Sequence, residues 1–171
     1  LVTGANRGLG LEFVRQYAGR GWRVIATARH PHDSPELTAL ATTHPNVSIE
    51  VLDVGARESI RDLALKLTGQ TLDVLLNNAG WLGDRDKQSF ATLDYQTFEE
   101  VLRINTFGPL AMAQAFMPHV LASEQKKIVV ITSGLSSLTN TSRFGKLYFY
   151  RASKAAVNMT MRTLQAEVRE Q

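Results

Sequence analysis

Short apolar runs alternate with helical stretches along the whole chain. Apolar positions recur every three or four residues after the first run, at Leu11, Val14, Tyr17 and Ala18, which predicts a helix with one buried face. The runs with the length and composition of strands are residues 1–3, 22–28, 47–52, 72–76 and 128–132. Strands that alternate with helices predict an α/β fold, doubly wound around a parallel sheet.

The same pattern predicts the order of the strands and the position of ligand chemistry. We expect the strand order 3-2-1-4-5, with ligands bound at the carboxyl ends, where the order reverses between strands one and four. Residues 72–76 and 128–132 are apolar apart from Asp73 and Thr132, which predicts burial on both faces of the sheet. A long helix is expected over residues 93–121, interrupted at Pro109 and ending near Pro118, and a last helix begins near Phe149.

No linker, repeat or low-complexity tract divides the chain, so a single domain over residues 1–171 is predicted. Its first strand is expected to begin before Leu1, and its last helix to continue past Gln171 towards further strands, so the domain is expected to be incomplete at both ends.

Composition excludes several classes of protein. The 171 residues include no cysteine, which rules out disulfides and thiolate chemistry, and the four histidines lack the spacing of metal ligands, so no metal site is predicted. The formal net charge of +3 comes from dispersed Lys and Arg rather than a basic stripe, so nucleic acid is not an expected partner. No apolar run approaches the ~20 residues of a membrane span. We therefore expect a cytoplasmic protein without a membrane partner.

A glycine-rich loop, TGANRGLG at residues 3–10, follows the first strand. Glycines there allow a tight turn, let backbone N–H groups approach a phosphate, and let the helix pack closely on the strand. An anion then lies at a helix N-terminus, where unpaired N–H groups and the helix dipole stabilise it. By itself, the loop is also compatible with a glycine-rich turn that binds nothing.

Three more motifs follow in order: NNAG at residues 77–80, Asn105 in the long helix, and YRASK at residues 150–154. With the loop, they make the chain resemble the short-chain dehydrogenase/reductase superfamily, in particular its carbonyl-reductase and C-factor-like members. The resemblance implies a Rossmann-like domain and a nicotinamide dinucleotide cofactor. The residues that it implies for cofactor binding are Gly4, Asn6, Arg7, Gly8, Leu9, Gly10, Asp53, Val54, Asn78, Ala79, Gly80, Tyr150 and Lys154. Asp53 could equally be the N-cap of the next helix.

The end of the second strand bears on the choice of cofactor. In this fold, an acidic residue there binds the adenosine ribose 2′-OH and selects NAD. This chain has Arg29 at that place and no carboxylate before Asp33. Because a guanidinium can bind a 2′-phosphate that a carboxylate would repel, Arg29 and Arg7 favour NADP(H). The alternative is that both arginines are ordinary surface residues.

Tyr150 and Lys154 are four residues apart at the start of a helix, so their side chains share one face. A free tyrosine, with a pKa of about 10, is a poor base near neutrality, and a nearby ammonium stabilises its phenolate. Such a tyrosine can donate a proton to a carbonyl oxygen, or accept one from an alcohol. The resemblance implies that Lys154 also binds the nicotinamide ribose, and that Asn105 anchors a water linking Lys154 to solvent. It also implies a homo-oligomer built on the helices that contain Asn105 and follow Tyr150.

The catalytic serine has two candidates. The family usually has it 13 residues before the tyrosine, which would be Ser137, but family strands end at the serine that aligns with Ser133. We choose Ser133, which requires a longer loop through residues 140–146. Its predicted role is a hydrogen bond to the substrate oxygen that stabilises developing negative charge.

Together, these features predict an NADP(H)-dependent oxidoreductase that transfers a hydride between the nicotinamide and a small carbonyl or alcohol substrate. An apolar or aromatic substrate would suit the residues that flank the predicted catalytic groups, which are Trp81, Leu135, Leu138, Phe144, Leu147 and Tyr148. The alternative is a non-catalytic NADP(H)-binding regulator on the same fold. Such regulators typically lose the tyrosine or the lysine, and this chain has both.

Overall fold

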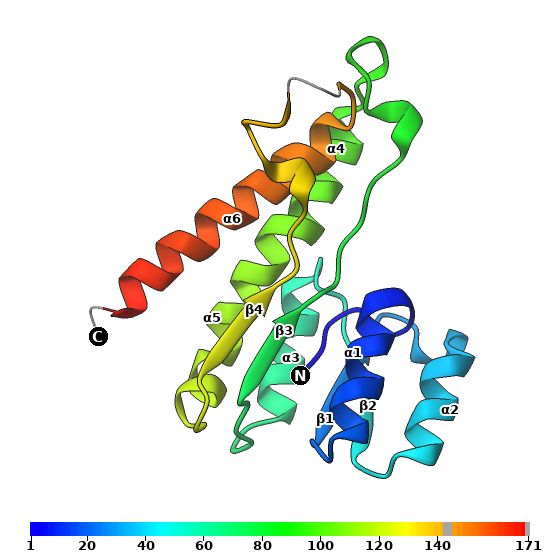
Figure 1. Cartoon of the computed structure of the whole chain (residues 1–171), viewed down its shortest axis with the longest axis vertical. Coiled ribbons are helices and arrows are strands. Elements are labelled where there is room, and N and C mark those ends of the chain that lie inside the picture. Colours follow the sequence, from blue (N-terminus) through cyan, green and yellow to red (C-terminus); the bar gives the residue numbers. More distant parts are fainter. Residues whose placement is uncertain (142–144, 170–171) are drawn as a thin grey trace. The chain divides into compact units, whose positions relative to one another are not determined.

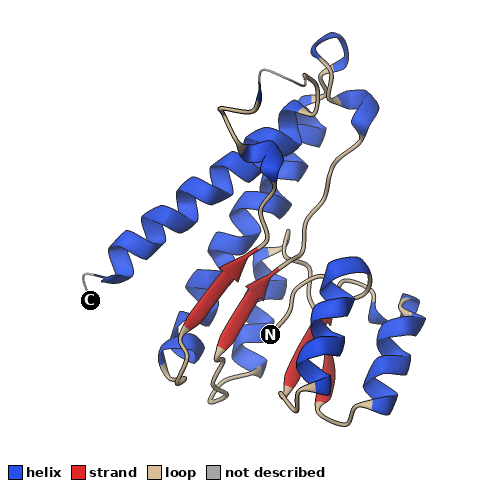
Figure 2. Ribbon diagram, in the orientation of Figure 1, coloured by secondary structure: helices blue, strands red, loops and turns tan. Residues whose placement is uncertain are grey.

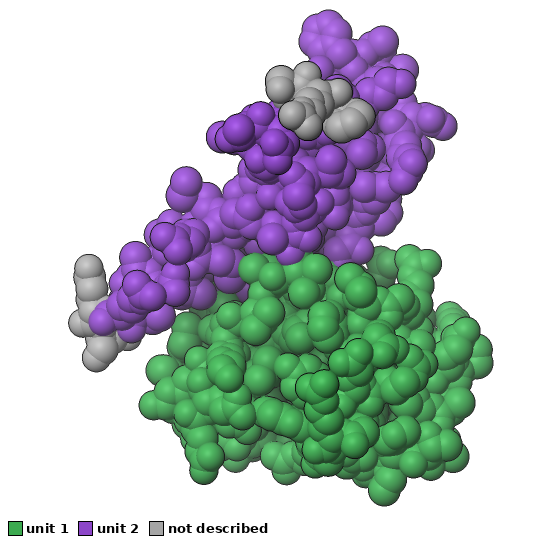
Figure 3. All heavy atoms as spheres, in the orientation of Figure 1, with its two compact units in different colours: residues 1–79, 111–131 green, residues 80–110, 132–171 purple. Residues whose placement is uncertain are grey.

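The computed structural model describes residues 1–141 and 145–169. These form two compact units, coloured separately in Figure 3. Unit 1 comprises residues 1–79 and 111–131, and unit 2 comprises residues 80–110 and the described part of 132–171. Phe144 and the middle of the loop expected at residues 140–146 lie outside the described residues.

Unit 1 contains a parallel sheet (Figures 1 and 2). Strand β1 (Val24–Ala28) pairs with β2 (Val47–Val51), and β3 (Val74–Asn77) pairs with β4 (Lys127–Val130). Val2 bridges both Ala26 of β1 and Leu76 of β3, so the N-terminal segment lies between those strands. The resulting order, β2-β1-Val2-β3-β4, confirms the predicted strand order.

Helices cover both faces of this sheet. On one face, α1 (Gly8–Gly19) and α2 (Pro35–Thr43) pack against Val24, Ala26 and Leu76. On the other face, α3 (Arg57–Lys66) and the unit 1 part of α5 (Gly108–Leu121) pack against Ile25 and Leu75. Alternate residues of one strand thus enter different cores, as the period of a strand requires. The doubly wound fold is confirmed.

Strand β4 corrects one expectation. Residues 128–132 were expected to be buried on both faces, yet Ile128 and Val130 are only half-buried and Val129 is 37% exposed. The reason is that β4 is the edge strand of the described sheet: it pairs with β3 alone, and the part of the chain that the structure describes leaves its faces incompletely covered.

Unit 2 consists mainly of helices. Its elements are α4 (Tyr95–Leu102), the π-helical turn η4 (Arg103–Phe107), the start of α5, α6 (Tyr148–Arg169), and the short 3₁₀ turns η2 (Arg85–Lys87), η3 (Phe90–Thr92) and η5 (Gly134–Ser136). Helices α4 and α6 pack through Phe98 and Phe149, whose rings stack with centroids 4.7 Å apart. None of the helices in the described ranges is long and apolar enough to span a membrane.

The long helix departs from its expected form. Helical structure runs from Tyr95 to Leu121, and its irregularity is η4 rather than a break at Pro109, which lies in the first turn of α5. Gly108 N–H donates to the carbonyl of Arg103, five residues earlier, which is the bond that widens a helical turn. Proline in a first turn costs little, because an N–H there lacks an intrahelical partner.

Candidate active site

The glycine loop of unit 1 is tightly folded against the NNAG segment. Gly4 and Gly8 have φ angles of +64° and +55°, a region that favours glycine. A Cβ on Gly10 would lie 2.1 Å from the carbonyl oxygen of Gly4, so a side chain there would displace the loop. The Thr3 hydroxyl accepts hydrogen bonds from the backbone N–H groups of Asn78 and Ala79, each at 3.0 Å. The first and second motifs therefore form one structure.

The N-terminus of α1 lacks groups that would compete with an anion. Arg7, at the N-cap, makes no side-chain capping bond, and the first turn contains no acidic residue. Arg7 and Leu9 are exposed, as is Arg29 directly after β1. Within residues 1–141 and 145–169, neither arginine takes part in an ion pair. Free guanidinium groups and an uncapped helix start suit phosphate groups.

Asp53 does not cap a helix, which resolves one alternative. Its carboxylate accepts a hydrogen bond from the N–H of Gly55 at 2.8 Å, while α3 begins later, with Ala56 at its N-cap. Asn78, expected to bind the cofactor, uses its amide to donate to the carbonyls of Thr3 (2.9 Å) and Gly4 (3.1 Å). Its role within the described chain is to hold the glycine loop.

In unit 2, Tyr150 and Lys154 share one face of α6. The Lys154 Nζ lies over the Tyr150 ring, 5.8 Å from its centroid, within the range of a cation–π contact. Lys154 is only 5% exposed, and this burial lowers the pKa of its ammonium group below the usual value of 10.5. A buried amine within cation–π distance of a tyrosine ring is compatible with a proton-transfer site.

Asn105 lies in η4 and is 1% exposed. Its Oδ1 accepts from the backbone N–H of Trp81 at 2.8 Å, and its Nδ2 donates to the carbonyl of Trp81 (2.8 Å) and to the hydroxyl of Ser153 (3.0 Å). Both amide hydrogens are therefore bonded to protein groups. Ser153 in turn donates to the carbonyl of Tyr150 at 2.8 Å, so Asn105 supports the backbone of the tyrosine.

Ser133 is the N-cap of η5, and its hydroxyl oxygen accepts from the N–H of Leu135 at 3.1 Å. Both flanks of Ser133 are fixed to α6 through Asn158. The Thr132 hydroxyl donates to Asn158 Oδ1 at 2.6 Å, and Asn158 Nδ2 donates to Ser136 at 2.9 Å. The Ser137 hydroxyl accepts a hydrogen bond of 3.3 Å from the N–H of Asn140, in the same segment.

Comparison with known proteins identifies the family. The profile described as short chain dehydrogenase matches residues 1–171. The chain belongs to the short-chain dehydrogenase family. A Rhodococcus relative, 1-hydroxy-2-glutathionyl-2-methyl-3-butene dehydrogenase, is 38% identical over 93% of this chain and 66% of its own length. This short-chain dehydrogenase spans about two thirds of the length of the curated relatives it matches.

Several solved structures have folds closely similar to that of this short-chain dehydrogenase. The NADPH-bound carbonyl reductase from chicken fatty liver is 34% identical, with a TM-score of 0.88 over 99% of this chain and 73% of that one. A carbonyl reductase from Pseudomonas aeruginosa in complex with NADP is 27% identical, with a TM-score of 0.85 over 97% of this chain and 74% of that one. The fold and the carbonyl-reductase-like branch are therefore confirmed.

Some of the expected substrate residues lie away from the tyrosine. Leu135, Leu138 and Tyr148 line a cavity of about 250 Å³ whose α6 wall includes Ala152. Tyr148 and Ala152 are each two residues from Tyr150, which is a rotation of about 200° around a helix. This cavity therefore borders the opposite face of α6 from Tyr150.

Two polar residues of unit 2 had no place in the predicted site. Asn158 follows Lys154 by four residues, a spacing that signals a shared helical face. Gln88 is fully buried, although it stands in the polar segment GDRDKQS, where no periodicity distinguishes it from exposed neighbours. Its contacts become visible only when residues distant in the sequence are brought together.

Proposed function

We propose that this short-chain dehydrogenase is an NADP(H)-dependent oxidoreductase that interconverts a carbonyl compound and an alcohol, with Tyr150 as the general acid/base. The observation that carries the proposal is the pairing of Tyr150 with the buried Lys154 on one face of α6. Carbonyl reductases solved with NADP or NADPH among the structural neighbours support the cofactor.

The donor set of unit 1 fits the phosphates of NADP(H). Gly4, Gly8 and Gly10 let the backbone approach a pyrophosphate at the uncapped start of α1. Arg29 and Arg7 would bind the 2′-phosphate with charge-assisted hydrogen bonds. The further residues proposed to bind the cofactor are Asn6, Leu9, Asp53, Val54, Asn78, Ala79, Gly80, Tyr150 and Lys154.

The reacting groups belong to unit 2. When bound, the nicotinamide supplies or accepts the hydride. Tyr150 donates its hydroxyl proton to the carbonyl oxygen during reduction, and the Lys154 ammonium stabilises the phenolate that remains. The Ser133 oxygen accepts from Leu135 N–H, and among the described residues its own proton has no acceptor. That proton is available to a substrate oxygen, where it would stabilise negative charge.

A substrate panel tests the proposed function. The protein at its natural length is mixed with NADPH and with aldehydes, ketones and quinones in turn, and the loss of NADPH absorbance is followed. We expect turnover with at least one carbonyl class. Tight NADPH binding without turnover of any of them would instead indicate a regulator.

Cofactor preference is expected to depend on Arg29. Arg29→Asp should weaken NADPH binding by about 2 kcal/mol, roughly 30-fold, and improve NADH relative to it, because an attractive contact becomes repulsive. Fluorescence titration of both cofactors measures this. Arg23→Asp, an equal charge change on the exposed residue before β1, is the control and should leave the ratio unchanged. Equal affinity of the unmutated protein for NADH and NADPH would contradict the assignment.

Two variants are expected to show which serine takes part in the reaction. Ser133→Ala should raise the barrier by about 3 kcal/mol, lowering kcat on the order of 10²-fold, as when one oxyanion donor is lost. Ser137→Ala should have a much smaller effect, because the Ser137 hydroxyl accepts a long hydrogen bond of 3.3 Å from the N–H of Asn140, within its own segment. Steady-state kinetics of both variants decides between them. The reverse ranking would assign the role to Ser137.

We also propose that the chain forms a homo-oligomer. Phe107 of η4, Leu110 of α5 and Met159 of α6 are 59%, 39% and 68% exposed. Large exposed apolar side chains on η4, α5 and α6 suit a homo-oligomer better than an isolated chain in water.

A further inference from the structure

Gln88 joins two segments of unit 2 through a single buried amide. Its side chain is 0% exposed. The Nε2 group donates to the carbonyls of Leu82 (2.8 Å) and Asp84 (3.1 Å), so both of its hydrogens are used. Its Oε1 accepts from the backbone N–H of Tyr150 at 3.0 Å. A buried amide that loses a hydrogen-bond partner is left unsatisfied, which is energetically costly. These hydrogen bonds therefore fix the position of one segment on the other.

The bond to Tyr150 replaces a local helix cap. The first N–H groups of a helix have no acceptor within the helix, and a side chain just before the helix usually supplies one. Before α6 stand Gly145, Lys146 and Leu147, and none has a side-chain oxygen. Gln88 supplies the acceptor instead, although it lies 62 residues earlier in the sequence.

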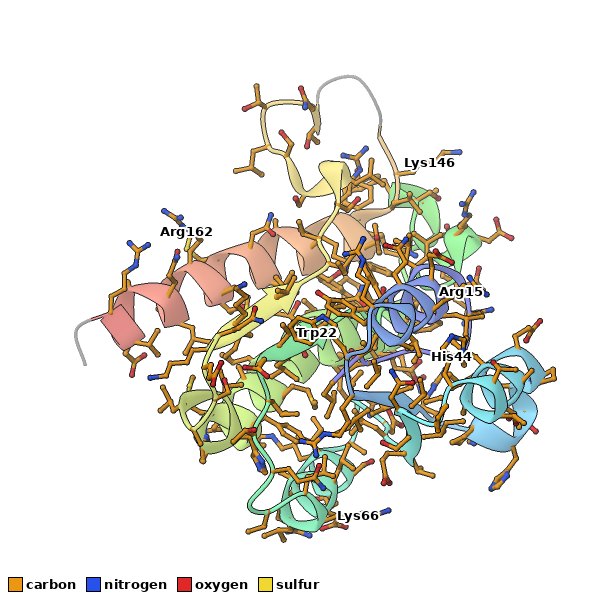
Figure 4. All side chains as sticks on the ribbon, turned by 60° about the horizontal axis from the view of Figure 1, so that its bottom comes forward. Arg15, Trp22, His44, Lys66, Lys146 and Arg162 are labelled. Atoms are coloured by element: carbon orange, nitrogen blue, oxygen red, sulfur yellow. The ribbon has the colours of Figure 1, made fainter. Side chains whose placement is uncertain are left out.

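The backbone of Gln88 holds the bend that leads into α6. Lys146, labelled in Figure 4, and Leu147 have φ angles of +66° and +57°, a left-handed conformation that is unfavourable for residues with a Cβ. Leu147 N–H donates to the carbonyl of Gln88 at 2.9 Å. Such strained residues persist only where surrounding contacts hold them, and Gln88 provides one of these contacts.

We propose that Gln88 is the positioning residue of Tyr150. It fixes the backbone N–H of Tyr150, while Ser153, held by Asn105, fixes its carbonyl. Both backbone polar groups of the tyrosine, its N–H and its carbonyl, are thus held, and its hydroxyl has little freedom beyond side-chain rotation. The inference rests on the proposed function of Tyr150 as the acid/base. A displacement of about 1 Å is enough to cost on the order of 10²-fold in rate.

Gln88→Met tests the inference, because methionine has a similar length and no hydrogen-bonding amide. We expect kcat to fall by about 10- to 100-fold, while Kd for NADPH stays within about twofold. Rates are measured well below the melting temperature, so that loss of folded protein does not contribute. Gln96→Met, at an exposed position of α4, is the matched control and should behave as the unmutated protein.

Gln88→Glu tests the acceptor and the donor of the Gln88 amide separately. It keeps an acceptor for Tyr150 N–H, but an ionised carboxylate cannot donate to Leu82 or Asp84. Burial favours the protonated acid, which can donate to one of them. The rate of Gln88→Glu relative to the unmutated protein should therefore recover as the pH falls from about 8.5 to about 6. Because protonation of a buried carboxylate also stabilises the fold, the comparison requires that Gln88→Glu be folded at both pH values, which circular dichroism checks.

Hydrogen exchange of the Tyr150 amide tests the positioning role of Gln88 independently of catalytic activity. The amide of Tyr150 should lose protection in Gln88→Met and keep it in Gln96→Met. If the unmutated protein reduces no carbonyl compound, the proposed function fails, and exchange still decides whether Gln88 holds Tyr150. If Gln88→Met lowers only the melting temperature, and both kcat and Tyr150 exchange match the unmutated protein, the positioning role is overturned.

Discussion

Tyr150→Phe is expected to lower kcat by at least about 10²- to 10⁴-fold, the range that general acid catalysis contributes, with Kd for NADPH nearly unchanged. The substitution removes only the hydroxyl. The ring that lies under Lys154 is kept, and so are the backbone bonds of Tyr150 to Gln88 and Ser153. Binding should therefore survive while the proton donor is lost.

Single-turnover kinetics with NADPH measures this loss directly, because it isolates the chemical step from product release. Tyr95→Phe, which removes a hydroxyl from a 68% exposed tyrosine of α4, is the control. If Tyr150→Phe retained most of the activity, the proposed chemistry would be wrong, whatever the substrate.

The sheet and its layers followed from sequence because local patterns determine them. The 3.6-residue period of Leu11, Val14, Tyr17 and Ala18 predicted the inner face of α1, where Leu11, Val14 and Ala18 are buried and Tyr17 is half-buried. The right order of strands followed from the rules of parallel α/β folds. The burial of β4 was predicted wrongly, since composition does not reveal which elements cover a strand.

The contacts within unit 2 could not be predicted from local sequence patterns. The π-helical turn at Arg103–Phe107 depends on a single bond from Gly108, and the helical period of the sequence barely changes there. Gln88 contacts Tyr150 across 62 residues, and nothing in its own segment requires burial. Local propensity does not encode long-range hydrogen bonds between irregular segments.

The candidate site was predicted as a set of residue types rather than as a network. The motifs placed Tyr150 and Lys154 on one helical face, and the structure brings them together. They did not predict that both amide hydrogens of Asn105 would be bonded to Trp81 and Ser153. Some residues that hold the candidate groups, such as Gln88 and Asn158, thus lie outside the motifs.

Lys154→Met is expected to reduce kcat at least as much as Tyr150→Phe, by about 10²- to 10⁴-fold or more. The variant keeps an unbranched side chain of similar length but removes the ammonium that stabilises the phenolate. A weaker Kd for NADPH is also expected, because the ammonium is a proposed contact of the ribose. Titration and single-turnover kinetics separate the two effects.

The same variant should be more stable than the unmutated protein near neutral pH. Burial lowers the pKa of Lys154 below 10.5, so between the folded value and 10.5 the unfolded chain binds more protons, and stability rises with pH. Below the folded pKa the whole cost of burying the charge is present, and above 10.5 it has disappeared. The stability difference should therefore shrink as the pH approaches 10.5, as denaturant unfolding can measure. Lys127→Met, at an exposed position, should show no such trend.

The double variant Tyr150→Phe/Lys154→Met tests whether the two residues act as one unit. If Lys154 acts mainly by stabilising the phenolate of Tyr150, the ammonium has little left to act on once the hydroxyl is gone. The double variant should therefore be about as slow as the slower single variant, rather than slower by the product of the two losses. Independent losses that multiply would mean that Lys154 contributes through the ribose contact alone. A gain in stability together with a loss of rate would show that the fold keeps a costly buried charge because the reaction needs it.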